Sequence, residues 1–164
     1  MEEGFIQNAV AYASRCRLQL RERLGFGIHG IIYVAEDKSA GGQTAIKAHR
    51  ELQPFRRELS IYERLREAGV SEILGFNVPQ FIRADDDLRV IEMTIVTRPF
   101  VLDFAGAYLD ASPDFPDEVW AEWEAEKRDQ FDVRWPNVQA VLEALEELGI
   151  HMLDVSPSNI AFLD

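Results

Sequence analysis

A short run of glycines is the first group of residues whose spacing suggests chemistry. Gly25, Gly27 and Gly30 are followed by mostly β-branched and aromatic residues from Ile31 to Ala35, as in a strand. A dinucleotide-binding fingerprint would instead need the glycines to open a helix. The run therefore predicts the tip of a β-hairpin. Without Cβ atoms, such a tip can lie close over phosphates and offer them its backbone N–H groups.

A lysine on the next strand and a glutamate on the following helix form a second group. Period-two alternation puts Ala45 and Lys47 on one face of the strand, so that the small alanine leaves room for a flat base while the lysine reaches phosphate oxygens. For a lone lysine, the simpler interpretation is a side chain in solvent. Glu58 favours the first interpretation, because it stands one step off the apolar stripe of its helix. There it can turn toward the sheet, pair with Lys47 and keep it protonated.

An aspartate and an asparagine near the C-terminus form a third group. Asp154 and Asn159 stand five positions apart in a loop whose Ser-Pro-Ser segment cannot continue a helix. Across such a loop they can converge on one point, as a carboxylate that accepts a hydroxyl proton and an amide oxygen that binds a hard cation. Taken alone, the same spacing also fits a turn residue and a loop cap.

The elements that position these residues follow from hydrophobic periodicity. A helix is expected over residues 3–15, strands around 18–24, 31–36 and 44–48, a helix after Pro54, and strands near 79–83 and 88–96. After Arg98 the pattern becomes helical, and Gly149 can end a strongly amphipathic helix over residues 138–148.

Composition bounds the class of protein. At 164 residues and 47% apolar content, the chain makes one ordinary domain or two small lobes with a real core. It has no apolar run long enough to span a bilayer, no basic start of a secretory signal, and a lone cysteine, Cys16. We therefore expect a soluble, cytoplasmic protein. One cysteine and three scattered histidines leave no zinc-ligand spacing.

The net charge of -12 is concentrated in one segment. Residues 110–132 hold nine acids against Lys127 and Arg128. Such a surface repels nucleic acid and anionic lipid, so neither is expected as a partner. We interpret the acids as the solvated face of a helix rather than as a docking patch for a basic protein. Trp120, Trp123 and Phe131 fall at helical spacing on the side expected to pack on the protein.

Taken in order along the chain, the three groups resemble the protein-kinase-like fold, which includes eukaryotic-type protein kinases and related small-molecule kinases. The motifs are Gly25-x-Gly27-x-x-Gly30-x-Ile32, Ala45-Ile46-Lys47, Glu58 and Asp154-x-x-Pro157-x-Asn159. The resemblance implies an α+β fold with a five-stranded antiparallel N-lobe sheet and one helix, over residues 1–97, with an extra N-terminal helix. A reduced, mostly helical C-lobe would occupy residues 98–164 and end just after the catalytic loop.

The resemblance also implies that the protein binds ATP. The glycines would cover the phosphates, Ile32 and Ala45 would pack on adenine, and Lys47 would hold the α- and β-phosphates. The residues implied to bind the nucleotide are Gly25, Gly27, Gly30, Ile32, Ala45, Lys47 and Glu58. The backbone somewhere in residues 92–98 would link the lobes and bind the base.

Catalysis would involve Lys47 and the C-terminal loop, with Asp154 as the catalytic base and Asn159 as a ligand of Mg²⁺. The chain departs from the family here, because Leu153 stands where the family has an arginine, and the interval from the lysine to the helix glutamate is short. The chain also ends at Asp164, before any Asp-Phe-Gly segment, which carries the family's principal magnesium ligand. Alternation points Asp164 to the opposite face from Asn159, so we expect it not to replace that ligand.

Two functions are compatible with these residues. The first is an ATP-dependent phosphotransferase, a minimal or truncated Ser/Thr-type protein kinase or small-molecule kinase, whose partners would be a nucleotide and a protein or small-molecule phosphoacceptor. The second is a catalytically inactive, pseudokinase-like module that binds nucleotide or a partner protein. Retention of the lysine, both acids and the asparagine favours the first, and the missing metal aspartate favours the second.

Overall fold

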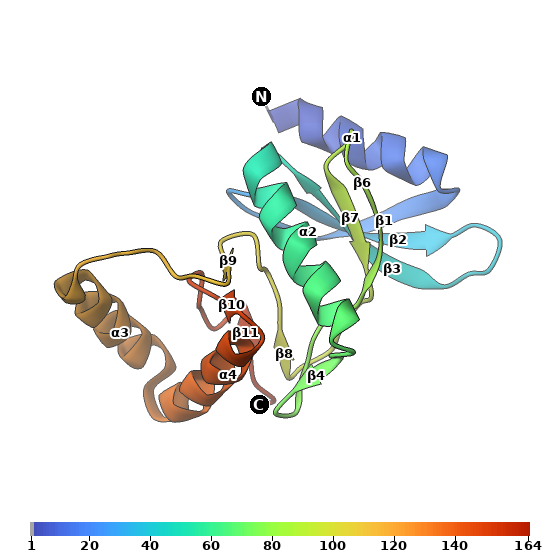
Figure 1. Ribbon diagram of the computed structural model, residues 1–164. Coiled ribbons are helices and arrows are strands. Elements are labelled where there is room, and N and C mark those ends of the chain that lie inside the picture. The colour runs from blue at the N-terminus through green and yellow to red at the C-terminus, as the bar shows by residue number, and fades with distance from the viewer. Residues whose placement is uncertain (1) are drawn as a thin grey trace.

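The computed structural model describes residues 2–164 and has an α+β fold (Figure 1). Its helices are α1 (Glu2–Arg15), α2 (Leu52–Glu67), α3 (Asp117–Phe131) and α4 (Trp135–Glu147), with a 3-10 turn over Asp132–Arg134. Its strands are β1 (Leu18–Phe26), β2 (Gly30–Asp37), β3 (Gln43–His49), β4 (Glu72–Ile73), β5 (Phe76–Asn77), β6 (Phe81–Asp85), β7 (Val90–Met93), β8 (Phe100–Val101), β9 (Tyr108–Leu109), β10 (Ile150–His151) and β11 (Ile160–Ala161).

The main sheet has five strands in the order β1-β2-β3-β7-β6, and every neighbouring pair is antiparallel. The two helices of this half of the chain pack on opposite faces of the sheet (Figure 1). On β3, the side chain of Ile46 belongs to the apolar cluster under α1, while that of Ala45 belongs to the cluster under α2. The structure thus confirms an α+β fold with a five-stranded antiparallel sheet, and the face that bears Lys47 is the one covered by α2.

Helix α1 is tied to the sheet by apolar packing and by one buried polar group. Phe5 and Ala9 are buried in the cluster that α1 shares with the strands. The hydroxyl of Tyr12 donates a 2.8 Å hydrogen bond to the carboxylate of Glu92, which is 2% exposed. Arg83 donates to the same carboxylate, at 2.7 Å. The buried carboxylate of Glu92 thus has hydrogen-bond partners, and the one from Tyr12 holds α1 against the sheet.

The segment after Arg98 is not helical, contrary to the sequence pattern. It forms the two-residue strands β8 and β9, and the next helix begins only at Asp117. Strand β8 lies in a second sheet of order β11-β8-β5-β4, and β9 pairs with β10. These pairings bring the C-terminal loop to the segment between β8 and β9. One apolar cluster runs from the main sheet through α2 to α4, across the expected lobe boundary at residue 97.

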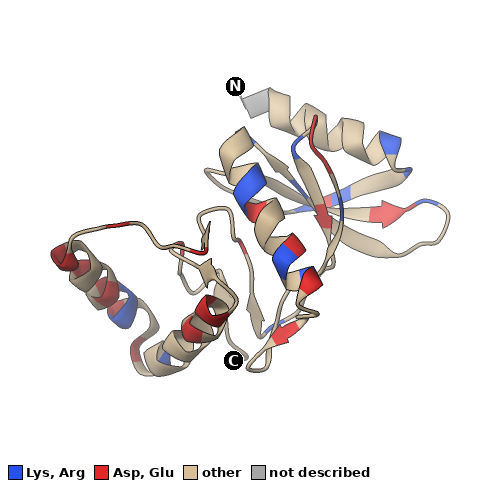
Figure 2. Cartoon of the chain, in the orientation of Figure 1, with Lys and Arg blue, Asp and Glu red and all other residues tan. Residues whose placement is uncertain are grey.

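The acidic segment forms α3, as predicted, at the outer end of the molecule (Figure 1). Its acidic residues are spread along the helix (Figure 2), and among its residues only Lys127 and Phe131 are buried. Trp120 and Trp123 are half-buried, and the indole N–H of Trp123 donates to the carbonyl oxygen of Leu153 at 3.3 Å. The prediction of a solvated acidic face with an aromatic packing side is confirmed.

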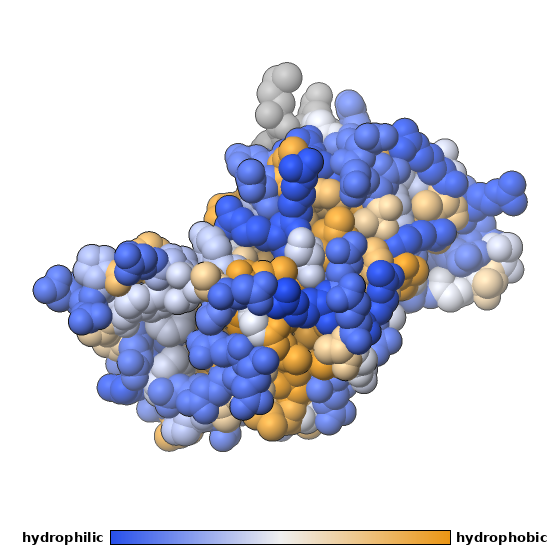
Figure 3. Space-filling view, in the orientation of Figure 1, coloured by the Kyte–Doolittle hydropathy of each residue, from blue (hydrophilic) through white to orange (hydrophobic). Residues whose placement is uncertain are grey.

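The surface of the viewed face is mostly hydrophilic, and apolar side chains reach it mainly in the lower half, around α4 and β4 (Figure 3). Across residues 2–164, no helix combines the length and the apolar character needed to cross a bilayer.

Candidate functional site

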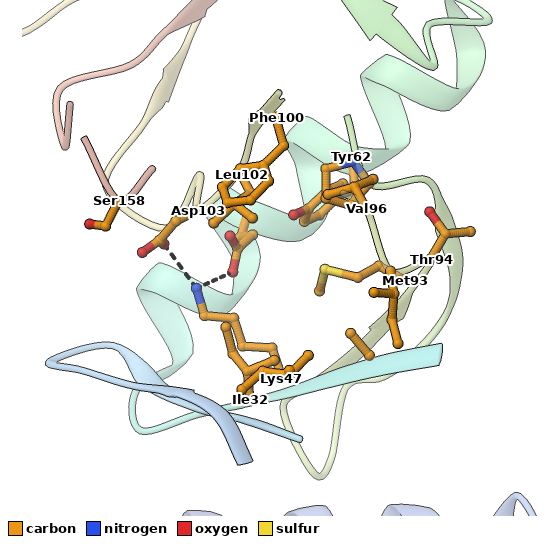
Figure 4. Close-up of a pocket in the computed structure, with 15 residues that line it drawn as sticks. Ile32, Lys47, Tyr62, Met93, Thr94, Val96, Phe100, Leu102, Asp103 and Ser158 are labelled. Atoms are coloured by element: carbon orange, nitrogen blue, oxygen red, sulfur yellow. Dashed lines mark hydrogen bonds and ion pairs between the residues drawn. The ribbon is translucent and has the colours of Figure 1, made fainter. Parts of the chain in front are cut away.

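A cavity of about 220 Å³ lies between the α2-covered face of the main sheet and the β8 segment (Figure 4). Its lining is mostly apolar, with polar groups at one end. The lining residues are Leu24, Ile32, Ala45, Lys47, Glu58, Tyr62, Pro79, Met93, Thr94, Ile95, Val96, Phe100, Leu102, Asp103 and Ser158. Ile32, Ala45, Lys47 and Glu58 were predicted to share a site, and the structure brings these four together. The segment predicted to link the lobes contributes Met93, Thr94, Ile95 and Val96.

Lys47 is the charged centre of the polar end. Its side chain is 5% exposed, and Nζ lies 2.9 Å from Oε1 of Glu58 and 2.9 Å from Oδ1 of Asp103 (Figure 4). Burial by itself would lower the pKa of Lys47, but the two carboxylates outweigh it and raise the pKa to about 12. The amine is therefore a fixed positive charge at the end of an apolar cavity.

Glu58 is fully buried on α2 and joins three parts of the chain. Its Oε1 atom contacts Lys47 and lies 2.7 Å from Nε2 of His49, and its Oε2 atom accepts a 2.7 Å hydrogen bond from the backbone N–H of Phe104. Burial alone would raise the pKa of Glu58, yet the charge of Lys47 and the hydrogen bond from His49 lower it to about 2. The predicted contact between Lys47 and Glu58 is thus present, in a charged and fully buried form.

Asp103 is the site residue that sequence analysis missed. The metal aspartate was considered missing because the family carries it downstream of Asn159, whereas the structure places an aspartate from upstream beside Lys47. The available signal was the sequence Asp103-Phe104-Ala105-Gly106, which differs from the expected Asp-Phe-Gly segment by one inserted alanine but precedes the C-terminal loop. Asp103 has a φ of 70°, a left-handed conformation that aspartate adopts more readily than most residues.

Strand pairing places Asp103 beside the C-terminal loop. Strand β8 ends two residues before Asp103 and pairs with β11, which directly follows Asn159. Between β8 and Asp103, the backbone N–H of Leu102 donates to the carbonyl oxygen of Asn159 at 2.9 Å. On the other side, a Cβ atom at Gly106 would lie only 3.3 Å from Cβ of Asp154. The Asp103 segment therefore runs past both residues predicted to act from the C-terminal loop.

The loop itself is held by its own asparagine. The Nδ2 atom of Asn159 donates to the backbone carbonyl of Asp154 at 2.9 Å, and Asn159 is 8% exposed. The two residues therefore meet across the loop through the Asp154 backbone, and the predicted convergence of the Asp154 carboxylate and the Asn159 amide oxygen stays a prediction. The Asp154 side chain is exposed and is not part of the cavity lining, to which the loop contributes Ser158.

The three glycines form the predicted hairpin between β1 and β2. The N–H of Gly27 donates to the carbonyl of Gly30 at 3.0 Å and closes the turn. Gly30 is required by a close approach, because a Cβ atom there would lie 2.1 Å from the carbonyl oxygen of Ala48. The base of the hairpin lines the cavity through Leu24 and Ile32, whereas none of the three glycines is among the lining residues.

Asp164 lies apart from the charged cluster. The expected strand ends at Ala161, and the Asp164 carboxyl is 93% exposed, with Oδ1 3.7 Å from Nη1 of Arg98. Over residues 4–164, no three His, Cys, Asp or Glu side chains are arranged to hold a metal ion by themselves. Comparison of the chain with protein-family models, curated proteins and solved structures finds no match in any of the three.

Proposed function

We propose that the protein binds Mg²⁺-ATP in this cavity and is a kinase-type phosphotransferase. The observation that supports the proposal most directly is the buried Lys47 shared between Glu58 and Asp103 at the end of an apolar cavity. A lysine held by a helix glutamate, beside an aspartate that can bind a metal, is the arrangement that phosphoryl-transfer enzymes of this kind use. Ile32 and Ala45 line the part of the cavity suited to a purine base.

The charges of the cluster require a cation when a nucleotide binds. Lys47 carries one positive charge against the carboxylates of Glu58 and Asp103, so the cluster cannot neutralise a triphosphate by itself. Mg²⁺ commonly uses one or two protein carboxylates and takes its other ligands from phosphates and water. Asp103 fits this role because its side chain is 25% exposed. Asn159 fits it because its amide nitrogen is engaged by the loop, leaving the amide oxygen as the ligand atom.

The position of Asp103 favours the phosphotransferase over the inactive binding module, because the module was suggested by the lack of a metal aspartate after Asn159. The metal aspartate follows the catalytic loop in the family that the sequence resembles, whereas Asp103 precedes it here. The β8–β11 and β9–β10 pairings carry this segment back to the loop. We infer that the same set of side chains is assembled from a permuted order of segments, and that no further aspartate is needed after Asn159.

In this proposal three residues of the site have separate roles. Bound Mg²⁺ would neutralise negative charge on the phosphates. Lys47 would hold phosphate oxygens, Glu58 would fix the lysine, and Asp154 would accept the proton of the acceptor hydroxyl. The exposed position of the Asp154 carboxylate suits an acceptor that approaches from solvent.

Nucleotide binding is tested by thermal denaturation with and without Mg²⁺-ATP. A ligand that binds only the folded protein stabilises it by about 2.7 kcal/mol at a hundredfold excess over its dissociation constant. We expect an increase in melting temperature for the wild type and none for Lys47→Ala. Lys38→Ala is the matched control, since Lys38 is an exposed lysine in the turn after β2. An equal increase in all three proteins would contradict binding at this cavity.

Turnover is tested separately, by phosphate release or transfer in wild type and Asp154→Asn. A lower rate in the variant supports the phosphotransferase. The position of the Asp154 side chain outside the cavity lining favours the alternative of a binding module without catalysis. Binding of Mg²⁺-ATP with equal background rates in both proteins would establish that alternative.

A further inference from the structure

Helix α1 lies outside the part of the chain covered by the kinase resemblance, and it contacts the glycine hairpin. The ring centroid of Phe5, a buried residue of α1, is 6.1 Å from that of Phe26, which lies within the glycine run. The guanidinium of Arg50, the residue after β3, lies 4.4 Å from the Phe5 centroid and 5.2 Å from the Phe26 centroid. Phe5, Arg50 and Phe26 together form what we call the hairpin anchor.

The anchor is attached to the hairpin through the main chain as well. The backbone N–H of Arg50 donates to the carbonyl oxygen of His29, inside the turn, at 3.0 Å. The side-chain Nε atom of Arg50 is buried without a hydrogen-bond partner among the described residues. The guanidinium is therefore held in position by stacking on the rings of Phe5 and Phe26. In this geometry an arginine gains from cation–π attraction.

Strand register shows what the anchor does to the hairpin. Phe26 pairs with Ile31, a residue of the apolar cluster under α1, while Gly25 pairs with Ile32, which lines the cavity. Because residues that pair directly lie on the same face of a sheet, the Phe26 side chain is on the α1 face and Gly25 is on the cavity face. The anchor therefore holds the Phe26 side chain on the face away from the cavity, while the backbone of Gly25 lies on the cavity face.

We propose that Arg50 is a positioning residue for the nucleotide phosphates, an inference that rests on the proposed function. By holding Phe26 against α1, it fixes the glycine hairpin in the orientation in which its backbone N–H groups can reach phosphate oxygens. The part of the cavity proposed for the purine base, lined by Ile32 and Ala45, lies at the base of the hairpin and not at its tip. Loss of the anchor should therefore weaken binding of a triphosphate and spare binding of the nucleoside.

The test compares the dissociation constants of Mg²⁺-ATP and adenosine by titration calorimetry. In Arg50→Gln we expect ATP to bind about five- to tenfold more weakly, from the loss of two cation–π contacts, with adenosine unchanged. Arg50→Lys keeps the charge but not the planar group and should be intermediate. Phe26→Leu, at a half-exposed position, should reproduce the effect with little risk to folding. Arg66→Gln is the matched control, because Arg66 stacks on Phe81, at 4.6 Å, on another part of the sheet.

Hydrogen exchange of the Gly27 amide provides a measurement that needs no ligand. This N–H bonds to the Gly30 carbonyl across the turn, so it should exchange faster in Arg50→Gln if the anchor orders the hairpin. The positioning role would be overturned if Arg50→Gln bound ATP and adenosine more weakly by the same factor. It would also be overturned if Arg50→Gln and Phe26→Leu both kept the wild-type affinity for ATP. A wild type that binds neither ligand would refute the proposed function and with it the role in phosphate binding. Exchange at Gly27 would then still show whether Arg50 orders the hairpin.

Discussion

Replacement of Lys47 by methionine tests the charged cluster without any ligand. The substitution keeps an unbranched side chain but leaves the carboxylate of Glu58 buried without its cation. Removing one partner of a buried ion pair costs about 3–5 kcal/mol. Because His49 and the N–H of Phe104 still contact Glu58, we expect the lower end, a loss of about 3 kcal/mol. The Asp103 side chain is 25% exposed, so water can replace its lost contact.

The free energy of unfolding from urea titrations at pH 7 measures this loss. A second variant, Lys47→Met with Glu58→Gln, removes the stranded charge while keeping a side chain that can accept from Phe104. We expect it to be more stable than the single variant by at least about 1 kcal/mol, because a neutral amide is less costly to bury than a carboxylate. A single variant that loses less than about 1 kcal/mol, or a double variant less stable than the single one, would refute the buried, charged cluster.

Three further predictions concern stability. Gly30→Ala forces a Cβ atom to within 2.1 Å of a carbonyl oxygen and should destabilise the protein by about 2 kcal/mol or more in urea titrations, whereas Gly27→Ala, with nothing within 4 Å, should change stability little. Folding lowers the pKa of Glu58 from 4.5 to about 2, so its contribution of about 3 kcal/mol is present above pH 4.5 and lost as the pH falls toward 2. Acid titration should show this loss in the wild type and not in Glu58→Gln. Tyr12→Phe removes a buried hydrogen bond to Glu92 and should cost about 1.5 kcal/mol, and an unchanged denaturation midpoint would show that α1 docks without it.

The parts of the site with a local signal could be predicted from the sequence. Alternation along β3 places Ala45 and Lys47 on one face, and the helical stripe of α2 leaves Glu58 directed at that face. The hairpin was predictable because glycines followed by β-branched residues leave few other structures. Each of these signals lies within one element or between consecutive elements, where periodicity is informative.

The parts fixed by distant pairing were not predictable. Strands β8 and β9 have two residues each, too few to show alternation, and their partners β11 and β10 lie about 40 to 60 positions downstream. The segment after Arg98 was therefore wrongly expected to be helical, and Asp103 was assigned no role. The stripe on α1 predicted a helix, but nothing in it indicated that Phe5 would contact the glycine hairpin.

Glu58 makes the position of α2 and the conformation of the Asp103 segment depend on each other. One oxygen of its carboxylate holds Lys47, and the other accepts the N–H of Phe104, the residue next to Asp103. If α2 moves away from the sheet, both contacts are lost together, and the lysine and the left-handed aspartate lose their common support. Movement of α2 would therefore weaken the support of Lys47 and of the Asp103 segment together, leaving the direct contact between Lys47 and Asp103 as the remaining link.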